Sequence, residues 1–112
     1  WYRSMYAGPD CPWMRSRGSI LAIRDTARSV SAEFKVVIFP MFIGLEGDYP
    51  LTAAHEEVTR FCKEHGIPVL DTLPLFTGMR TEDLIVHPKD RHPNARAHKI
   101  VGHAVAEFLR EK

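Results

Sequence analysis

The stretch that decides the fold is KVVIFPMF, residues 35–42, near the middle of the chain. It is a continuous apolar run, rich in β-branched residues and punctuated by Pro40. A run without polar alternation is typical of a strand buried on both faces, as in a parallel sheet that is covered by helices. We therefore expect a buried parallel strand at this position.

Amphipathic helices are expected on both sides of this strand. The first should extend from about Trp13 to Ala32, because apolar residues recur there at helical spacing. They are Ile20, Ile23, Ala27 and Val30. The second should end just before Gly66, since glycine is favoured directly after a helix end. Its apolar positions are Leu51, Ala54, Val58, Phe61 and Cys62.

The last part of the chain is expected to hold one more strand and one more helix. IPVLDTL, residues 67–73, is a second apolar run, with Asp71 near its end, and residues 74–93 should be mostly loop. Asn94 is a favoured N-cap, and an apolar stripe at helical spacing follows it. The stripe consists of Ile100, Val101, Ala104, Val105, Phe108 and Leu109.

This order of elements predicts the fold class. Helix, strand, helix, strand and helix follow one another, which is typical of an α/β domain whose strands are parallel and joined by a right-handed crossover. The aromatic-rich residues 1–13 are expected to be irregular. With 112 residues the chain is long enough for one modest core, so we expect a single α/β domain over residues 1–112.

Composition narrows the classes of function. The net charge of +1 argues against nucleic acid as the main partner, because a phosphate-binding surface needs a clear basic excess. No apolar run approaches the ~20 residues of a membrane span. The two cysteines are too few for a disulfide scaffold and do not form a metal-ligand pair, so we expect two ordinary thiols, a disulfide being the alternative.

A candidate catalytic pair lies just before the last predicted helix, in KDRHPN, residues 89–94. Asp90 and His92 are two residues apart, and in an extended segment such side chains point to the same side. Ligands of parallel α/β sheets bind at the carboxyl ends of the strands, where this segment is expected to lie. A carboxylate beside an imidazole is also the arrangement that activates a serine hydroxyl. A polar loop that caps the helix is the simpler interpretation.

Three segments together carry a resemblance to a known family. FKVVIFP, GIPVLDTLPLF and DRHPNARAHKIVGHAVAEFL resemble the C-terminal half of an SGNH (GDSL-type) hydrolase, over residues 13–112. The resemblance implies a three-layer α/β/α sandwich, similar to flavodoxin, and an esterase, lipase or deacetylase that acts on a small-molecule ester without a cofactor or metal. It implies that Asp90 and His92 are the acid and base of the catalytic triad. Pro93, Asn94, Gly102 and His103 match the rest of the family's last motif.

Two features depart from the family pattern. The commonest family spacing is Asp-x-x-His, whereas this chain has Asp-x-His, so Asp83 is the alternative carboxylate for His92. The Gly-Asp-Ser nucleophile motif and the oxyanion-hole Gly and Asn have no counterpart, since Gly47-Asp48 is followed by Tyr49. We therefore expect the C-terminal portion of such a domain, inactive by itself. Its partner would be the missing N-terminal half or, as second choice, another copy in a homodimer.

Other interpretations stay open at this point. Asp-x-His also occurs at the metal centres of phosphoesterases, where further ligands follow in separate loops, and this sequence has no such series. A nucleotide site is not favoured, because no G-x-G-x-x-G or P-loop pattern is present. The second class of function is a non-catalytic interaction or structural module. The chain begins at Trp1 without an initiator Met, so we expect a fragment or processed piece and predict no compartment.

Overall fold

The computed structural model of the chain describes residues 2–111, with side chains from residue 4 onward. It is a mixed α/β structure with three α-helices and two small sheets among these residues. The elements in chain order are η1 (Tyr2–Tyr6), α1 (Pro12–Ser29), β1 (Val36–Ile38), α2 (Thr52–Glu64), β2 (Val69–Asp71), η2 (Leu73–Leu75), η3 (Thr81–Asp83), β3 (Ile85–His87), β4 (Asp90–Pro93) and α3 (Ala95–Arg110), where η denotes a 3₁₀ helix.

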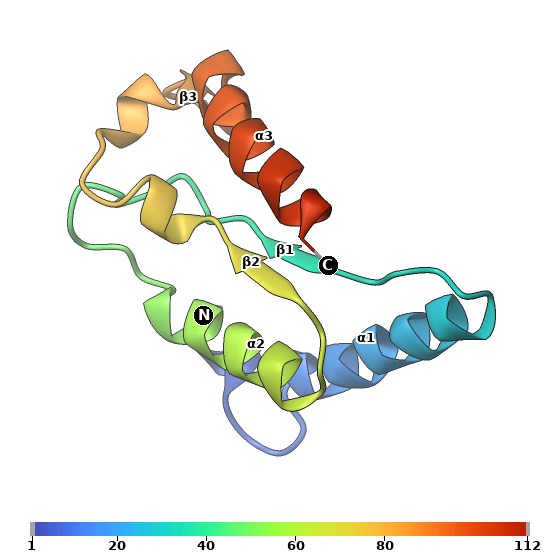
Figure 1. Ribbon diagram of the computed structural model, residues 1–112. Coiled ribbons are helices and arrows are strands. Elements are labelled where there is room, and N and C mark those ends of the chain that lie inside the picture. Colours follow the sequence, from blue (N-terminus) through green and yellow to red (C-terminus); the bar gives the residue numbers. More distant parts are fainter. Residues whose placement is uncertain (1, 112) are drawn as a thin grey trace. The chain divides into compact units, whose positions relative to one another are not determined.

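The strands β1 and β2 form a parallel pair (Figure 1). The N–H of Val36 donates to the carbonyl of Pro68 at 2.9 Å, and the N–H of Thr72 donates to the carbonyl of Ile38 at 3.0 Å. The pairing is parallel because the residue numbers rise together along both strands. The predicted pair of parallel strands is therefore confirmed, and with it the α/β class.

The predicted burial of the first strand is wrong. β1 is three residues long and half-buried, and Phe39, which follows it, is 46% exposed. Pro40 has no N–H to offer to a neighbouring strand, and this limits regular pairing to the residues before it. Within the described residues β1 pairs with β2 alone, so the apolar run is covered less completely than its composition suggests.

The chain divides into two compact units, and the boundary passes through the paired strands. One unit comprises Trp1–Val36 and Leu51–Val69, and the other comprises Val37–Pro50 and Leu70–Lys112. Each unit has its own cluster of buried apolar side chains. The candidate catalytic residues all belong to the second unit.

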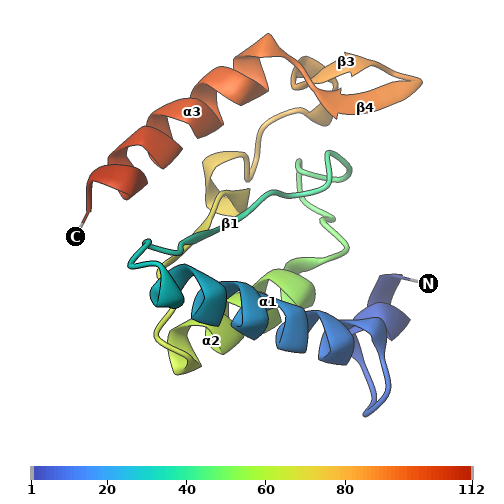
Figure 2. The ribbon, with the colours of Figure 1, turned by 90° about the vertical axis from the view of Figure 1, so that its right-hand side faces the viewer.

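Helices α1 and α2 pack against each other in the first unit (Figures 1 and 2). Trp13 lies edge-on to Phe61, with ring centroids 5.3 Å apart, and its indole N–H donates to Glu57 at 3.3 Å. The buried cluster consists of Cys11, Trp13, Phe61, Cys62 and Ile67. Gly66 ends α2 at a φ of +66°, as the sequence predicts, with the N–H of Ile67 bonded to the carbonyl of Cys62 at 2.8 Å.

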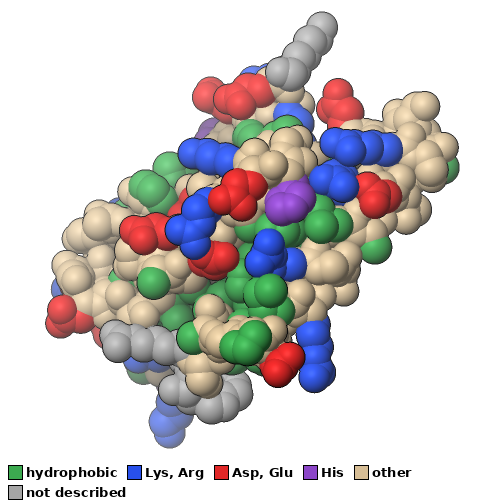
Figure 3. All heavy atoms as spheres, turned by 90° about the horizontal axis from the view of Figure 1, so that it is seen from below, with side chains coloured by type: hydrophobic (Ala, Val, Ile, Leu, Met, Phe, Trp, Pro, Cys, Tyr) green, Lys and Arg blue, Asp and Glu red, His purple; other side chains and the backbone are tan. Residues whose placement is uncertain are grey.

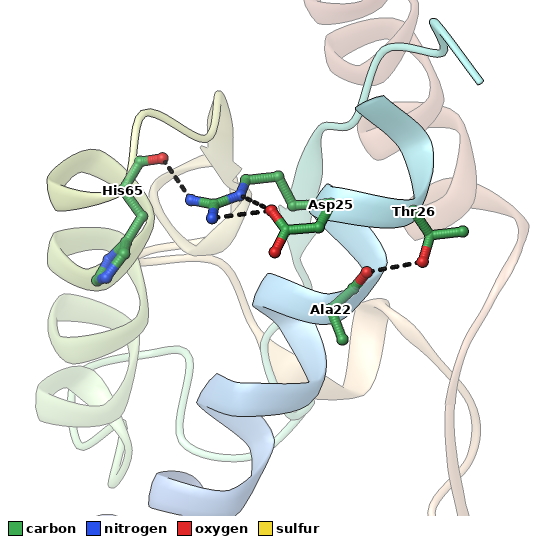
Figure 4. A network of polar contacts seen from close by, with 5 residues as sticks. Ala22, Asp25, Thr26 and His65 are labelled. Atoms are coloured by element: carbon green, nitrogen blue, oxygen red, sulfur yellow. Dashed lines mark hydrogen bonds and ion pairs between the residues drawn. The ribbon is translucent and has the colours of Figure 1, made fainter. Parts of the chain in front are cut away.

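The buried face of α1 differs from the predicted face. Arg24 points toward the end of α2, where its guanidinium donates to the carbonyl of His65 at 3.2 Å and pairs with Asp25 at 3.0 Å (Figure 4). Ile23 and Val30 are instead 55% and 70% exposed, so their assignment to the packed face is wrong. The aliphatic part of an arginine side chain can pack on apolar surface while its guanidinium bonds to the end of a helix. The packed face of α1 is therefore shifted toward Arg24.

The second unit packs α3 against the loops that follow β1 and β2. Its buried cluster consists of Phe42, Leu45, Phe76, Leu84, Ile85, Ala97 and Val101. The predicted N-cap is confirmed, because Asn94 Oδ1 accepts from the N–H of Ala97 at 3.1 Å. Most of the predicted stripe of α3 is at least half-buried, but Leu109 is 61% exposed and does not belong to it.

Residues 74–93, which were expected to be mostly loop, contain two 3₁₀ turns and a β-hairpin. β3 and β4 pair antiparallel, with Ile85 opposite Pro93 and His87 opposite Asp90 (Figure 2). The hairpin is short and mostly exposed, so its sequence lacks the apolar alternation by which a half-buried strand is recognised. Asp90 and His92 are therefore strand residues rather than loop residues.

The surface over α1 and α2 has mixed charge. Acidic and basic side chains are interspersed there, with hydrophobic atoms exposed between them (Figure 3). Among residues 2–111, no helix is both long and apolar enough to cross a lipid bilayer.

Candidate active site

The β3–β4 hairpin positions the candidate catalytic pair. Alternate residues of a strand project to opposite faces, so Asp90 and His92 share one face of β4 and Arg91 occupies the other. Arg91 donates to the carbonyl of Phe42 at 3.0 Å and thereby joins the hairpin to the loop after β1. Asn94 joins the hairpin to α3, because its side-chain amide donates to the carbonyl of Ile85 in β3 at 3.2 Å while its side-chain oxygen caps α3.

The two side chains of the pair are in direct contact. Asp90 Oδ1 lies 2.5 Å from His92 Nδ1 and also accepts the backbone N–H of His92 at 3.1 Å. The predicted contact is therefore found, and Asp90 rather than Asp83 supplies the carboxylate. A carboxylate on Nδ1 keeps the proton of the neutral imidazole on that nitrogen and leaves the lone pair on Nε2. This is the tautomer that a general base for a hydroxyl requires. Whether the pair is catalytic stays a prediction.

The electrostatics of the pair favour the ionised carboxylate. The side-chain hydrogen bond with His92 lowers the pKa of Asp90, and the backbone N–H of His92 and the nearby charges of His92 and His87 lower it further. The carboxylate therefore stays ionised well into the acid range. The imidazole is 84% exposed and the carboxylate 51% exposed, so water screens their interaction, and Nε2 is accessible to another group.

An open hollow of about 460 Å³ lies beside the pair, within the second unit. Two segments line it, namely residues 39–43, which directly follow β1, and residues 89–93 of the hairpin. Its surface is mostly apolar. The position after the end of a parallel strand is where α/β sheets bind ligands, as the sequence predicts.

The hollow contains no serine nucleophile among its described residues. None of the side chains that line it is Ser, Thr or Cys. Tyr49 accepts the N–H of Met41 through its hydroxyl at 3.0 Å. It therefore supports the loop that lines the hollow. Whether the chain lacks a nucleophile of its own stays a prediction.

The loop between β1 and α2 has a compact form that depends on Gly44. Gly44 has a φ of +60°, and a Cβ built on it would lie 2.6 Å from the carbonyl oxygen of Asp48. Thr81 closes the same loop, because its hydroxyl accepts the N–H of Leu45 at 3.1 Å and its own N–H donates to Glu46 at 2.7 Å. This hydrogen bond from Thr81 lowers the pKa of Glu46. The glutamate therefore serves as a structural acceptor.

Possible metal ligands and the two cysteines are the other reactive side chains that the sequence raised. No group of three or more His, Cys, Asp or Glu side chains among residues 4–111 is placed to hold a metal ion. Cys11 and Cys62 are free thiols, both buried, and burial raises the pKa of the Cys62 thiol. Cys62 therefore serves as a packing residue of the first unit.

Sequence reasoning found the pair but missed what surrounds it. Residues 39–42 lie within the apolar run that predicts a buried strand, whereas in the structure they line the hollow, and the sequence gives no indication of the bond that Arg91 makes to Phe42. The sequence did contain one signal for these lining residues. Pro40 marks the end of regular pairing, and α/β sheets bind ligands beside the segment that directly follows a parallel strand.

Comparison of the chain with protein-family models, with curated proteins and with solved structures gave no significant match. The function is therefore inferred from the site itself and from the resemblance of its motif.

Proposed function

We propose that this chain supplies the acid–base part of a serine ester hydrolase of the SGNH type. The observation that carries the proposal is the contact between Asp90 Oδ1 and His92 Nδ1 beside an apolar hollow. In a serine triad a carboxylate orients an imidazole, and the imidazole activates the serine hydroxyl. The nucleophilic serine and the oxyanion hole would come from a segment outside these 112 residues.

Each half of the reaction, acylation and deacylation, proceeds through two proton transfers at His92. Nε2 takes the proton of the serine hydroxyl while the serine oxygen bonds to the ester carbonyl carbon. When the tetrahedral intermediate collapses, the carbon–oxygen bond to the alcohol breaks and the proton passes from Nε2 to the leaving oxygen. Water then attacks the acyl-serine by the same route and releases the carboxylic acid. Asp90 stabilises the imidazolium throughout and stays ionised, in keeping with its lowered pKa.

The proposal extends to the fold. The parallel pair β1–β2, with helices on either side of it in sequence, would be part of a three-layer α/β/α sandwich whose remaining strands lie outside the chain. A sheet of two short strands is marginal in isolation.

The experiment compares the isolated chain with the longest polypeptide that its coding region encodes. The isolated chain should give no serine-dependent hydrolysis of p-nitrophenyl acetate and no labelling by a fluorophosphonate probe. The longer polypeptide should be labelled, and His92→Ala should lower its kcat by a factor of at least ~10⁴, since loss of a triad member costs roughly 10⁴–10⁶ in kcat. Labelling of the isolated chain, or full activity of the longer His92→Ala variant, would contradict the proposal.

A non-catalytic interaction module is the second candidate. It is favoured by the absence of Ser, Thr and Cys from the described residues that line the hollow. The same labelling experiment separates the two candidates, since a longer polypeptide that contains no reactive serine would support the module.

A further inference from the structure

The hollow beside His92 is apolar where a substrate would contact it. The loop after β1 contributes Phe39, Pro40, Met41, Phe42 and Ile43, and the hairpin adds Pro93. Phe39 and Met41 are 46% and 37% exposed, so a ligand can reach their side chains without displacing other groups. Exposed apolar side chains that converge on one concavity are the usual lining of a small-molecule site.

The charged residues of the hollow are mostly engaged with the protein itself. Arg91 donates to the carbonyl of Phe42, and Asp90 is bonded to the ring and backbone of His92. Lys89 is the remaining charged side chain at the hollow. The rest of the lining is apolar, so a neutral apolar group fits it.

The chemistry of the pair decides which half of an ester would lie there. His92 returns its proton to the leaving oxygen, so the alcohol portion must be adjacent to Nε2 when the carbon–oxygen bond breaks. The acyl carbon is held by the serine and the oxyanion donors, and neither belongs to the residues that line the hollow. We propose that the hollow binds the alcohol portion of the ester and that this portion is an apolar alkyl or aryl group. The inference rests on the proposed function.

The dimensions of the hollow agree with such a group. About 460 Å³ lies within the range of roughly 300–1,000 Å³ that is typical of small-molecule sites. The hollow is open on one side, so an alcohol portion longer than its depth would continue into solvent. Binding should therefore tighten with alkyl length up to a limit and then stop changing.

The test measures binding of the alcohols themselves to the isolated chain, which requires no nucleophile. The chain contains four methionines, and methyl-¹³C labelling gives a separate NMR signal for Met41 in the hollow. Ethanol, 1-butanol and 1-hexanol should shift this signal in a saturable way. Each added methylene should lower the dissociation constant up to about fourfold, the factor that corresponds to ~0.8 kcal/mol per buried methylene. Hexanoate should bind more weakly than 1-hexanol.

Two variants make the result specific. Phe39→Ser removes an exposed lining residue and should weaken 1-hexanol binding at least fivefold. Val86→Ser is the matched control, because Val86 is 59% exposed on the same hairpin but does not line the hollow, and it should leave binding unchanged. An unshifted Met41 signal, equal loss in both variants, or tighter binding of hexanoate would overturn the inference. Labelling of the longer polypeptide by fluorophosphonate reports separately on the proposed function.

Discussion

Asn94 holds the segment that carries the catalytic pair, and its replacement should measurably destabilise the second unit. Its Oδ1 caps α3 at Ala97, and its amide donates to the carbonyls of Asp83 at 2.9 Å and Ile85 at 3.2 Å. Loss of an N-cap costs ~1 kcal/mol. The bond to Ile85 is partly buried and adds ~1 kcal/mol, whereas the exposed bond to Asp83 adds less because water replaces it. Asn94→Ala should therefore lower the free energy of unfolding by about 2–2.5 kcal/mol.

Asn94→Ser divides this loss into two parts. Serine retains an oxygen that can cap the helix but has no amide to reach the two carbonyls, so the expected loss is about 1–1.5 kcal/mol. The assay is urea denaturation followed by circular dichroism, with linear extrapolation to water. Glu107→Ala, at an exposed position of α3, is the control and should stay within ~0.5 kcal/mol of the wild type. A loss below 0.5 kcal/mol for Asn94→Ala, or equal losses for the alanine and serine variants, would refute the assigned roles of Asn94.

Two further predictions concern the loop after β1 and the pair itself. Gly44→Ala should lower the free energy of unfolding by at least ~2 kcal/mol in the same urea assay, because the residue has a positive φ and its new Cβ would lie 2.6 Å from the carbonyl oxygen of Asp48. Gly47→Ala is the control, since a Cβ there meets open space, and it should be neutral or slightly stabilising. Equal effects of the two substitutions would contradict the reasoning. The ¹³C carboxyl signal of Asp90 should titrate with a midpoint below the usual 3.8, so that its contribution to stability is present above that pH and is lost as pH falls through the lowered pKa. In His92→Ala the midpoint should rise toward the usual value, and an unchanged midpoint would show that His92 does not lower it.

The features that the sequence predicted correctly are those with local causes. Helix α2 and its end at Gly66 follow from apolar spacing and from the conformational freedom of glycine within a few residues. The contact of Asp90 with His92 follows from the pleat of an extended chain, which places side chains two apart on one face. The cap at Asn94 needs only the first turn of α3.

The features that the sequence did not predict depend on distant partners. The exposed side of α1 is set by Arg24, whose bond to His65 crosses from one helix to another and cannot be read from the periodicity of α1. The half-burial of β1 depends on how much sheet surrounds it, and composition alone does not specify that. The β3–β4 hairpin was missed because its residues are mostly polar and exposed.

The tautomer of His92 tests most directly whether Asp90 prepares this imidazole as a general base. Two-dimensional ¹⁵N–¹H NMR of the histidine rings, at a pH at which the imidazole is neutral, distinguishes a protonated Nδ1 from a protonated Nε2. In the wild-type chain the proton should reside on Nδ1, held by Asp90 Oδ1, and Asp90→Ala should abolish this preference. A wild-type ring protonated mainly on Nε2, or the same tautomer ratio in both proteins, would contradict the acid–base role of the pair.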